Sequence, residues 1–206
     1  MRNYPLTFSV DYPDRELNRL TSFFRIFTVI PIAIVLFSVL GPSGGGGAGG
    51  DSGVYLAAGG FLFFPPLLML LFRKKYPVWW ANWNRELMRF ANRVHIYLWL
   101  MDDTYPSTDE EQSVHLDFPT PDGEQLSRGL PLVKWLLAIP HYIVLFFLYL
   151  AAFFAVIIAW FAILFTGRYP ESIFNFAEGV LRWSNRVIAY AFILVTDEYP
   201  PFSLEA

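Results

Sequence analysis

The sequence has no cysteine, few histidines and few charged residues. Its 206 residues include three histidines (His95, His115 and His141), and 16% are Asp, Glu, Lys or Arg. The absence of cysteine excludes disulfides, thiolate nucleophiles and cysteine-ligated zinc or iron-sulfur sites. The histidines share no metal-ligand spacing, and no serine or threonine has a local His and acid constellation. We therefore expect no enzymatic activity, no metal site and no cofactor.

Apolar residues take the place of the missing charges. The chain is 55% hydrophobic and 19% aromatic, whereas soluble domains contain roughly 25% charged residues. The net charge of -3 comes from acidic clusters such as residues 102–103 and 109–111, which leaves no basic footprint for nucleic acid. This composition predicts a membrane protein that contacts lipids and no nucleic acid.

Six Tyr-Pro pairs divide the chain, and most fall at matching points of two similar halves. Superposing residues 25–31 on 134–140 places a cation, Arg25 or Lys134, six residues before a proline in both halves. Three further pairs of segments match in the same order: 73–77 with 166–170, 89–94 with 182–187, and 103–106 with 197–200. Ordered matches of this kind predict two tandem repeats, residues 1–106 and 107–206.

The first repeat contains two apolar runs. Residues 20–40 and 54–72 have about the ~20 residues needed to cross a bilayer, and Pro65 and Pro66 kink the second run. Between them lies the glycine-rich segment 41–53, a flexible connector that lacks the ending of a phosphate-binding loop. A transmembrane hairpin is therefore predicted.

The second repeat contains one apolar run, residues 130–165. Lys134 lies 109 positions after its matching residue in the first half, whereas Arg168 lies only 93 positions after its own. The difference is close to the length of the glycine-rich connector, which the second half lacks. The spacing favours a transmembrane or re-entrant hairpin that turns near residues 149–152. The alternative is a single tilted helix, longer than the ~25 residues usual for a span.

The positive charges predict how these hairpins are oriented. Cations lie before the first apolar run and after the second: Arg15, Arg19, Arg25, Arg73, Lys74 and Lys75. By the positive-inside rule, both ends of the hairpin and both chain termini face the cytoplasm. We expect a multi-pass protein of the bacterial inner (cytoplasmic) membrane with two parallel repeats.

An amphipathic helix follows each apolar region, at residues 78–100 and 171–195. Each begins after a Tyr-Pro pair, because proline suits a first helical turn. Helices with one basic and one Trp-rich face lie in the headgroup plane. The predicted interfacial anchors are Trp79, Trp80, Trp83, Trp183, Arg25 and Lys134. We expect Arg25 and Lys134 to snorkel, so that their charged ends reach the membrane interface. The alternative is a buried pairing with Asp11, Asp103 or Asp197.

Arginines four residues apart mark the polar face of both amphipathic helices. Two pairs, each with an asparagine beside it, make up the candidate binding site: Arg89, Arg93 and Asn92, and Arg182, Arg186 and Asn185. Such forks suit a lipid phosphate or a partner carboxylate. The alternative is that the arginines pair with Glu86 and Glu178 and only solvate the helix.

Two short segments alternate polar and apolar residues. Residues 4–10 and 113–118 read as short strands or extended arms, one before each repeat. The predicted fold is an all-α membrane protein with two tandem repeats and short extended arms. Each repeat is a transmembrane or re-entrant helical hairpin followed by an interfacial amphipathic helix.

The second half also resembles a known family. Residues 136–147, 159–170, 181–187 and 199–202 are similar to the bacterial membrane family called domain of unknown function 4389, and the resemblance covers residues 130–204. The first half looks like a diverged copy. The resemblance implies an integral bacterial membrane protein with no established activity.

These patterns favour a non-catalytic membrane protein. We expect an accessory subunit of a larger membrane complex, or a bilayer-organising scaffold that binds lipid headgroups, a membrane partner or further copies of itself. The alternative is a small transporter, channel or lipid-transfer component whose path is lined by Arg25, Lys134 and His141.

Overall fold

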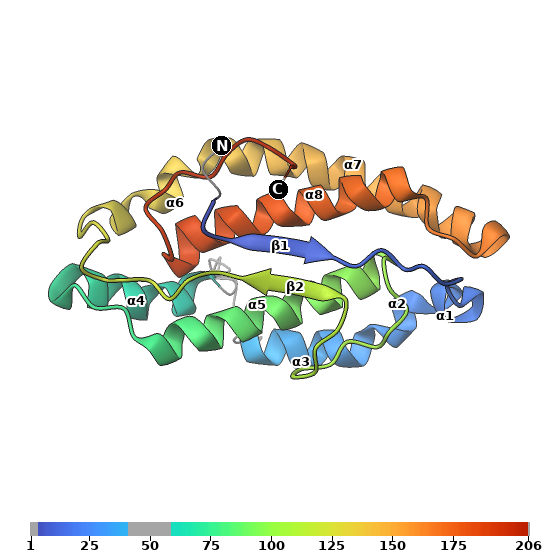
Figure 1. Cartoon of the computed structure of the whole chain (residues 1–206), viewed down its shortest axis with the longest axis horizontal. Helices are drawn as coiled ribbons and strands as arrows, with labels where there is room; N and C mark the ends of the chain where they lie inside the picture. The colour runs from blue at the N-terminus through green and yellow to red at the C-terminus, as the bar shows by residue number, and fades with distance from the viewer. Residues whose placement is uncertain (1–3, 41–58, 206) are drawn as a thin grey trace, which may run out of the picture.

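The computed structural model describes residues 4–40 and 59–205, which are mostly helical with one small antiparallel sheet (Figure 1). The all-α prediction is correct for most of the chain, and the two predicted strands or extended arms contribute the sheet, whose pairing was not predicted. The glycine-rich connector 41–53 and the first residues of the second predicted span, 54–58, lie outside the described residues.

A two-stranded ribbon lies at the middle of the long axis of the molecule (Figure 1). Strand β1, Thr7–Val10, pairs antiparallel with β2, Val114–Asp117, so that Phe8 faces Leu116 and Ser9 faces His115. Because strand side chains alternate, one side of the ribbon is buried and the other is exposed. The two predicted arms therefore form one sheet and join the two halves of the chain.

The first apolar run is divided into three helices rather than one span. They are α1 (Arg19–Phe23), α2 (Arg25–Thr28) and α3 (Ile30–Leu40). Asn18 caps α1, because its side chain accepts hydrogen bonds from two backbone N–H groups of the first turn. Pro31 has no N–H to offer the preceding turn, which accounts for the break before α3.

The second apolar run forms α4, Gly59–Arg73, which contains Pro65 and Pro66. The structure describes 15 residues of α4 and 11 of α3, and both helices adjoin residues 41–58, which lie outside the described part of the chain. In Figure 1, α1, α2, α3 and α4 follow one another along the lower side of the molecule.

The predicted hairpin at 130–165 is wrong. After η1 (Leu130–Leu132) and α6 (Lys134–Leu137), helix α7 runs without interruption from Ile139 to Thr166. No proline or glycine lies between Pro140 and Gly167, so nothing in the sequence ends the helix at residues 149–152. Gly167 ends it with a φ of 76°. Within the described residues, α7 is the one helix long and apolar enough to cross a membrane.

The two amphipathic segments form the middle layer of the protein. Helix α5 spans Val78–Leu98, and α8 spans Glu171–Ile188 and continues into a π-helical turn, η2 (Ala189–Ile193). Strand β1 packs on one side of α8 and α7 on another, while β2 and α3 pack on α5. The sequence placed both helices at the membrane interface. In the structure the ribbon packs on their polar faces, although Glu86 of α5 remains exposed.

The apolar helices α1 to α4, α6 and α7 form the layer beyond α5 and α8. At one end α1 contacts α7, where the Trp160 indole donates a 3.2 Å hydrogen bond to the Ser22 carbonyl. At the other end α4 contacts η1 and η2, and Leu67 and Leu70 pack with Leu194. These helices carry most of the exposed large apolar side chains, among them Phe23, Phe27, Ile34, Phe37, Phe72, Phe147, Phe154 and Phe165.

Candidate functional site

Helices α5 and α8 meet at a buried pair of asparagines. The Asn92 amide donates to the Asn185 oxygen at 2.9 Å, and the Asn185 amide donates to the Asn92 oxygen at 2.8 Å. Each amide also donates to the backbone carbonyl four residues earlier in its own helix. All amide groups of the pair are thereby used inside the protein. The sequence singled out both residues but assigned them to headgroup binding.

One arginine on each helix reaches the strand that packs against it. Arg89 Nε donates to the Leu116 carbonyl at 2.8 Å, and Arg182 Nε donates to the Phe8 carbonyl at 2.9 Å. Phe8 and Leu116 are directly opposite one another in the ribbon. The two arginines therefore attach the ribbon to the helices from both sides of a single strand pair.

Both arginines also pair with a glutamate of their own helix. Arg89 contacts Glu86 at 2.7 Å, and Arg182 contacts Glu178 at 2.5 Å. These are the pairings given above as the alternative to a headgroup clamp. In addition, the Glu178 carboxylate accepts a hydrogen bond from the Val10 N–H, so the pair on α8 contributes to the attachment of the ribbon.

The second arginine of each pair is buried. Arg93 donates to the Ser107 carbonyl at 3.1 Å, and Arg186 donates to the Glu205 carbonyl at 2.7 Å. Burial lowers the pKa of both guanidinium groups from their ordinary value. Each of the four arginines thus donates to at least one protein acceptor, and they do not form the open phosphate fork that the spacing suggested.

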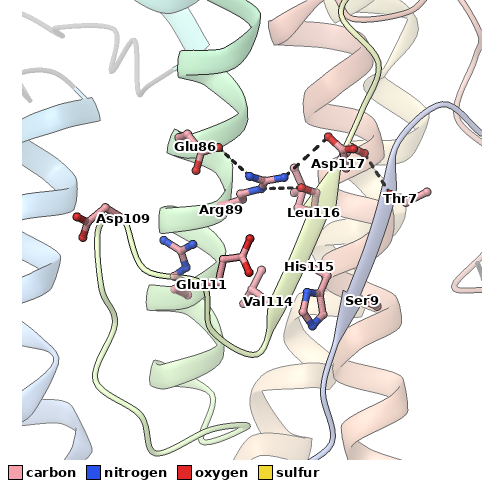
Figure 2. Close-up of a pocket in the computed structure, with 11 residues that line it drawn as sticks. Thr7, Ser9, Glu86, Arg89, Asp109, Glu111, Val114, His115, Leu116 and Asp117 are labelled. Atoms are coloured by element: carbon pink, nitrogen blue, oxygen red, sulfur yellow. Dashed lines mark hydrogen bonds and ion pairs between the residues drawn. The ribbon is translucent and has the colours of Figure 1, made fainter.

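A polar hollow lies where Arg89 and Arg93 face strand β2 (Figure 2). Its volume is about 430 Å³, and it is lined by residues of α5, of both strands and of the segment that leads into β2. Figure 2 shows Arg89 lying between Glu86 and Asp117, and Asp109 and Glu111 also line the hollow. Four carboxylates against two guanidinium groups disfavour an anionic ligand and suit a neutral or basic polar group.

The surroundings of the arginines on α8 are different. There the C-terminal residues supply the acceptors, because Arg182 Nη1 donates to the Leu204 carbonyl at 2.9 Å and Arg186 also reaches Ser203. Gly179 allows this approach, since a Cβ at that position would lie 2.9 Å from the Leu204 Cβ. The C-terminal segment therefore covers the pair on α8, whereas the pair on α5 lines a hollow.

The two cations predicted to snorkel are buried instead. Lys134 is 0% exposed, and its ammonium lies 2.7 Å from Asp197 Oδ1 and donates to the Thr196 carbonyl at 2.6 Å. Arg25 donates to the Asp102 carbonyl at 2.9 Å, and its guanidinium lies 3.9 Å from the centre of the Tyr97 ring. Snorkelling fails because both side chains point into the protein, where acceptors are already in place.

Asp103 and Asp197 hold the segments that follow the two amphipathic helices. Asp103 accepts from the Asn18 N–H at 3.1 Å and pairs with Arg15, while Asp197 accepts from the Ser127 N–H at 2.7 Å. Burial acts to raise the pKa of Asp197, but the hydrogen bonds from Lys134 and Ser127 outweigh it and hold the pKa below its ordinary value. The pKa of Asp103 is lowered in the same way by Asn18 and Arg15, against the effect of burial.

The predicted tryptophan anchors divide into two groups. Trp79 and Trp83, at the start of α5, are exposed, and Trp80 is half-buried between them. Trp183 is buried and donates a 3.0 Å hydrogen bond to His141 Nδ1, so its prediction as an interfacial anchor is wrong. Trp183 and His141 are far apart in the sequence, so local patterns did not predict this contact.

Residues 131–203 match the model of a protein family described as Domain of unknown function (DUF4389). The match contains α6, α7, α8 and η2 and covers less than half of the chain. Searches of curated proteins and of solved structures give no match. The chain is thus similar to this family over its second half.

The asparagine pair leads to a test of the contact between α5 and α8. Replacing Asn92 with Leu leaves Asn185 buried without its partner, and we expect a loss of about 1–3 kcal/mol in the free energy of unfolding. The double variant Asn92→Leu/Asn185→Leu removes both polar groups and loses less than the sum of the single variants. Denaturant unfolding in detergent, followed by circular dichroism, measures these differences.

Asn84→Leu is the matched control. The Asn84 amide also donates to the carbonyl four residues earlier, at 2.8 Å, but this acceptor, the Trp80 carbonyl, lies within its own helix. We expect a smaller loss than in Asn92→Leu. If the two asparagine substitutions are simply additive, the amide pair does not couple the helices.

The pair formed by Lys134 and Asp197 predicts a dependence of stability on pH. Asp197→Asn leaves the buried ammonium without its counter-charge and should lower stability by about 3 kcal/mol at neutral pH. Because folding lowers the pKa of Asp197, its contribution is present above the unfolded pKa of about 3.9 and is lost as the pH falls through the folded value.

Unfolding measured between pH 7 and pH 2 checks this point. The wild type should lose stability below about pH 4, and Asp197→Asn should show a shallower loss over the same window. The double variant Lys134→Met/Asp197→Leu should recover most of the stability. Equal slopes for the wild type and Asp197→Asn would contradict the assignment.

Proposed function

We propose that this chain is a membrane-embedded structural protein without catalytic activity, an accessory subunit or bilayer-organising scaffold of the bacterial inner membrane. One observation carries the proposal. The apolar helices carry most of the exposed large apolar side chains, whereas monomeric soluble proteins rarely expose apolar patches beyond a few hundred Å². One of these helices, α7, has the length and composition of a membrane span.

The internal use of the polar residues supports a scaffold. The two asparagines, the four arginines and the two buried cations all bond to groups of the same chain. Hydrogen bonds between buried polar groups make a structure more rigid and more specific. These groups therefore stabilise the fold. The surfaces left for function are the exposed faces of the apolar helices and the exposed, polar side of the ribbon formed by β1 and β2.

We further propose that the chain contains two copies of one structural unit. Contacts at corresponding positions support this: Arg25 lies over Tyr97 and Lys134 over Tyr190, and the N–H groups of Asn18 and Ser127 donate to Asp103 and Asp197. Positive φ angles recur as well, at Leu100 with Leu194 and at Lys74 with Gly167. Helix α7 would then correspond to α3 and α4 together, with the glycine-rich connector as an insertion.

The partners that we propose are membrane lipids on the apolar side and a subunit of a larger complex, or another copy of this chain, on the ribbon side. Partner binding is assigned to the hollow at Arg89 and Arg93, because C-terminal residues cover Arg182 and Arg186. The multi-pass arrangement with both termini in the cytoplasm, inferred from the positive charges, stays a prediction.

The transport alternative gains no support from the positions of its proposed residues. Arg25 and Lys134 lie in separate clusters at the two ends of the middle layer, and His141 packs against Trp183 and Phe202. None of these residues lines the hollow. A path through the protein would have to break the contacts that hold these side chains.

Reconstitution tests the proposal. We expect the purified protein to float with liposomes on a density gradient and to leave the flux of protons, potassium and small solutes equal to that of protein-free liposomes, because its polar groups are engaged inside the fold. Fluorescent indicators inside the vesicles measure the flux, and flotation confirms that the protein is incorporated. Flux above the protein-free level that disappears in Lys134→Ala would contradict the scaffold and support the transporter.

A further inference from the structure

The polar ribbon lies at the same level as the middle of α7. Along α8, the Ser184 hydroxyl accepts a 2.9 Å hydrogen bond from Tyr149 of α7, and two residues earlier Arg182 donates to Phe8 of β1. Tyr149 belongs to the central part of Ile139–Thr166. Figure 1 shows the same relation, with both strands centred on the long axis and α7 running parallel to that axis.

This placement conflicts with a perpendicular crossing by α7. If the helix spanned a bilayer, the exposed groups of the ribbon side would lie at the depth of the hydrocarbon core. These groups include Asp11, paired with an exposed His115, and the exposed carboxylates of Glu86 and Asp117. Ionisable side chains at that depth are rare and face a protein interior or a water-filled cavity.

The layers of the fold offer a different orientation. The ribbon packs on one side of α5 and α8, and the apolar helices pack on another. On α8, Glu178 and Arg182 face the strand, while Trp183 and Ser184 bond to α7. The molecule is therefore polar along one long side and apolar along another, as expected for a protein that lies in a membrane surface.

The helix lengths agree with that orientation. At 1.5 Å per residue, the 28 residues of α7 extend over about 42 Å, more than the ~30 Å of a hydrocarbon core. The described parts of α3 and α4 extend over about 16 and 22 Å. A flat arrangement accommodates long and short helices equally.

The two ends of the molecule carry cations that complement anionic headgroups. Arg73 and Lys75 are exposed after α4, and Arg19 and Arg168 are exposed at the opposite end, where α1 contacts the end of α7. Trp79 and Trp135 are exposed beside the apolar helices. Lysine, arginine and tryptophan at the border of an apolar surface are typical of the lipid–water interface.

We propose that the protein lies within one leaflet, with α7 and the helices α1 to α4 parallel to the plane of an anionic phospholipid bilayer and with none of the described helices crossing it. The inference rests on the proposed membrane location and specifies its geometry, in place of the multi-pass arrangement predicted from the positive charges. The apolar helices enter the outer part of the acyl chains, the end cations bind lipid phosphates, and the ribbon stays in water on the same side as both ends of α7.

Nitroxide labels on α7 test the orientation. Ile143, Phe154 and Phe165 are exposed by 56%, 57% and 78%, and they are 11 residues apart, which returns to nearly the same face of a helix. The chain contains no cysteine, so a single cysteine at each position can be labelled without further substitutions. The labelled proteins are reconstituted into phosphatidylglycerol and phosphatidylcholine vesicles. Collision rates with oxygen and with a water-soluble nickel chelate then give the depth of each label.

We expect the three labels to lie at one shallow depth. In a crossing helix, successive labels would differ in position along the bilayer normal by about 16 Å, with the label at 154 deepest; that result would overturn the inference while leaving the membrane location intact. Three labels fully accessible to the nickel chelate would contradict the membrane location as well. The two failures are therefore distinguishable.

A second series guards against a variant that does not fold. Phe147 and Ile158 are also exposed and 11 residues apart, and they should report the same depth as the first series. A label at Ser9, on the exposed side of β1, should be accessible to the nickel chelate. A pore formed by several copies would also leave Ser9 in water, but it would give graded depths along α7 and so count against the inference.

Discussion

The crossing of α5 and α8 at Asn92 and Asn185 is the contact on which the rest of the structure depends. These two helices pack both on the strand ribbon and on the apolar layer, and the amide pair joins them. Two amides that satisfy one another in a buried position fix both the distance and the register of the helices, because a shift by one residue would leave polar groups without partners. The ribbon and the apolar helices then take their positions from α5 and α8.

The scarcity of charge in this chain gives each buried polar residue a structural task. Arg89 and Arg182 bind carbonyls of the ribbon. Arg93 binds a carbonyl of the segment after α5, and Arg186 and Lys134 bind carbonyls of the segment after η2. Backbone carbonyls in turns and chain ends need donors when they are removed from water. Regularly spaced arginines on a helix can therefore bind backbone carbonyls of neighbouring segments and stabilise the fold, even where their spacing suits an external phosphate.

Local patterns in the sequence were sufficient for some elements and insufficient for others. The Tyr-Pro pairs and the 3.6-residue period correctly placed helices that begin at Val78 and Glu171, since both signals act within one turn or one face. The hairpin at 130–165 was wrong because it was inferred from the spacing of the other half, whereas the residues of α7 contain no break. The burial of Lys134 and the partner of Asn92 depend on segments far away in the sequence, which periodicity cannot identify.

The central claim is that the apolar helices face lipid while the ribbon faces water. Labelling with a lipid-soluble carbene precursor in vesicles, mapped by mass spectrometry, tests it most directly. The account predicts modification of exposed residues on α3 and α7, such as Phe37 and Phe154, and none on Ser9 or His115. Modification of the ribbon, or an unmodified α7, would contradict it.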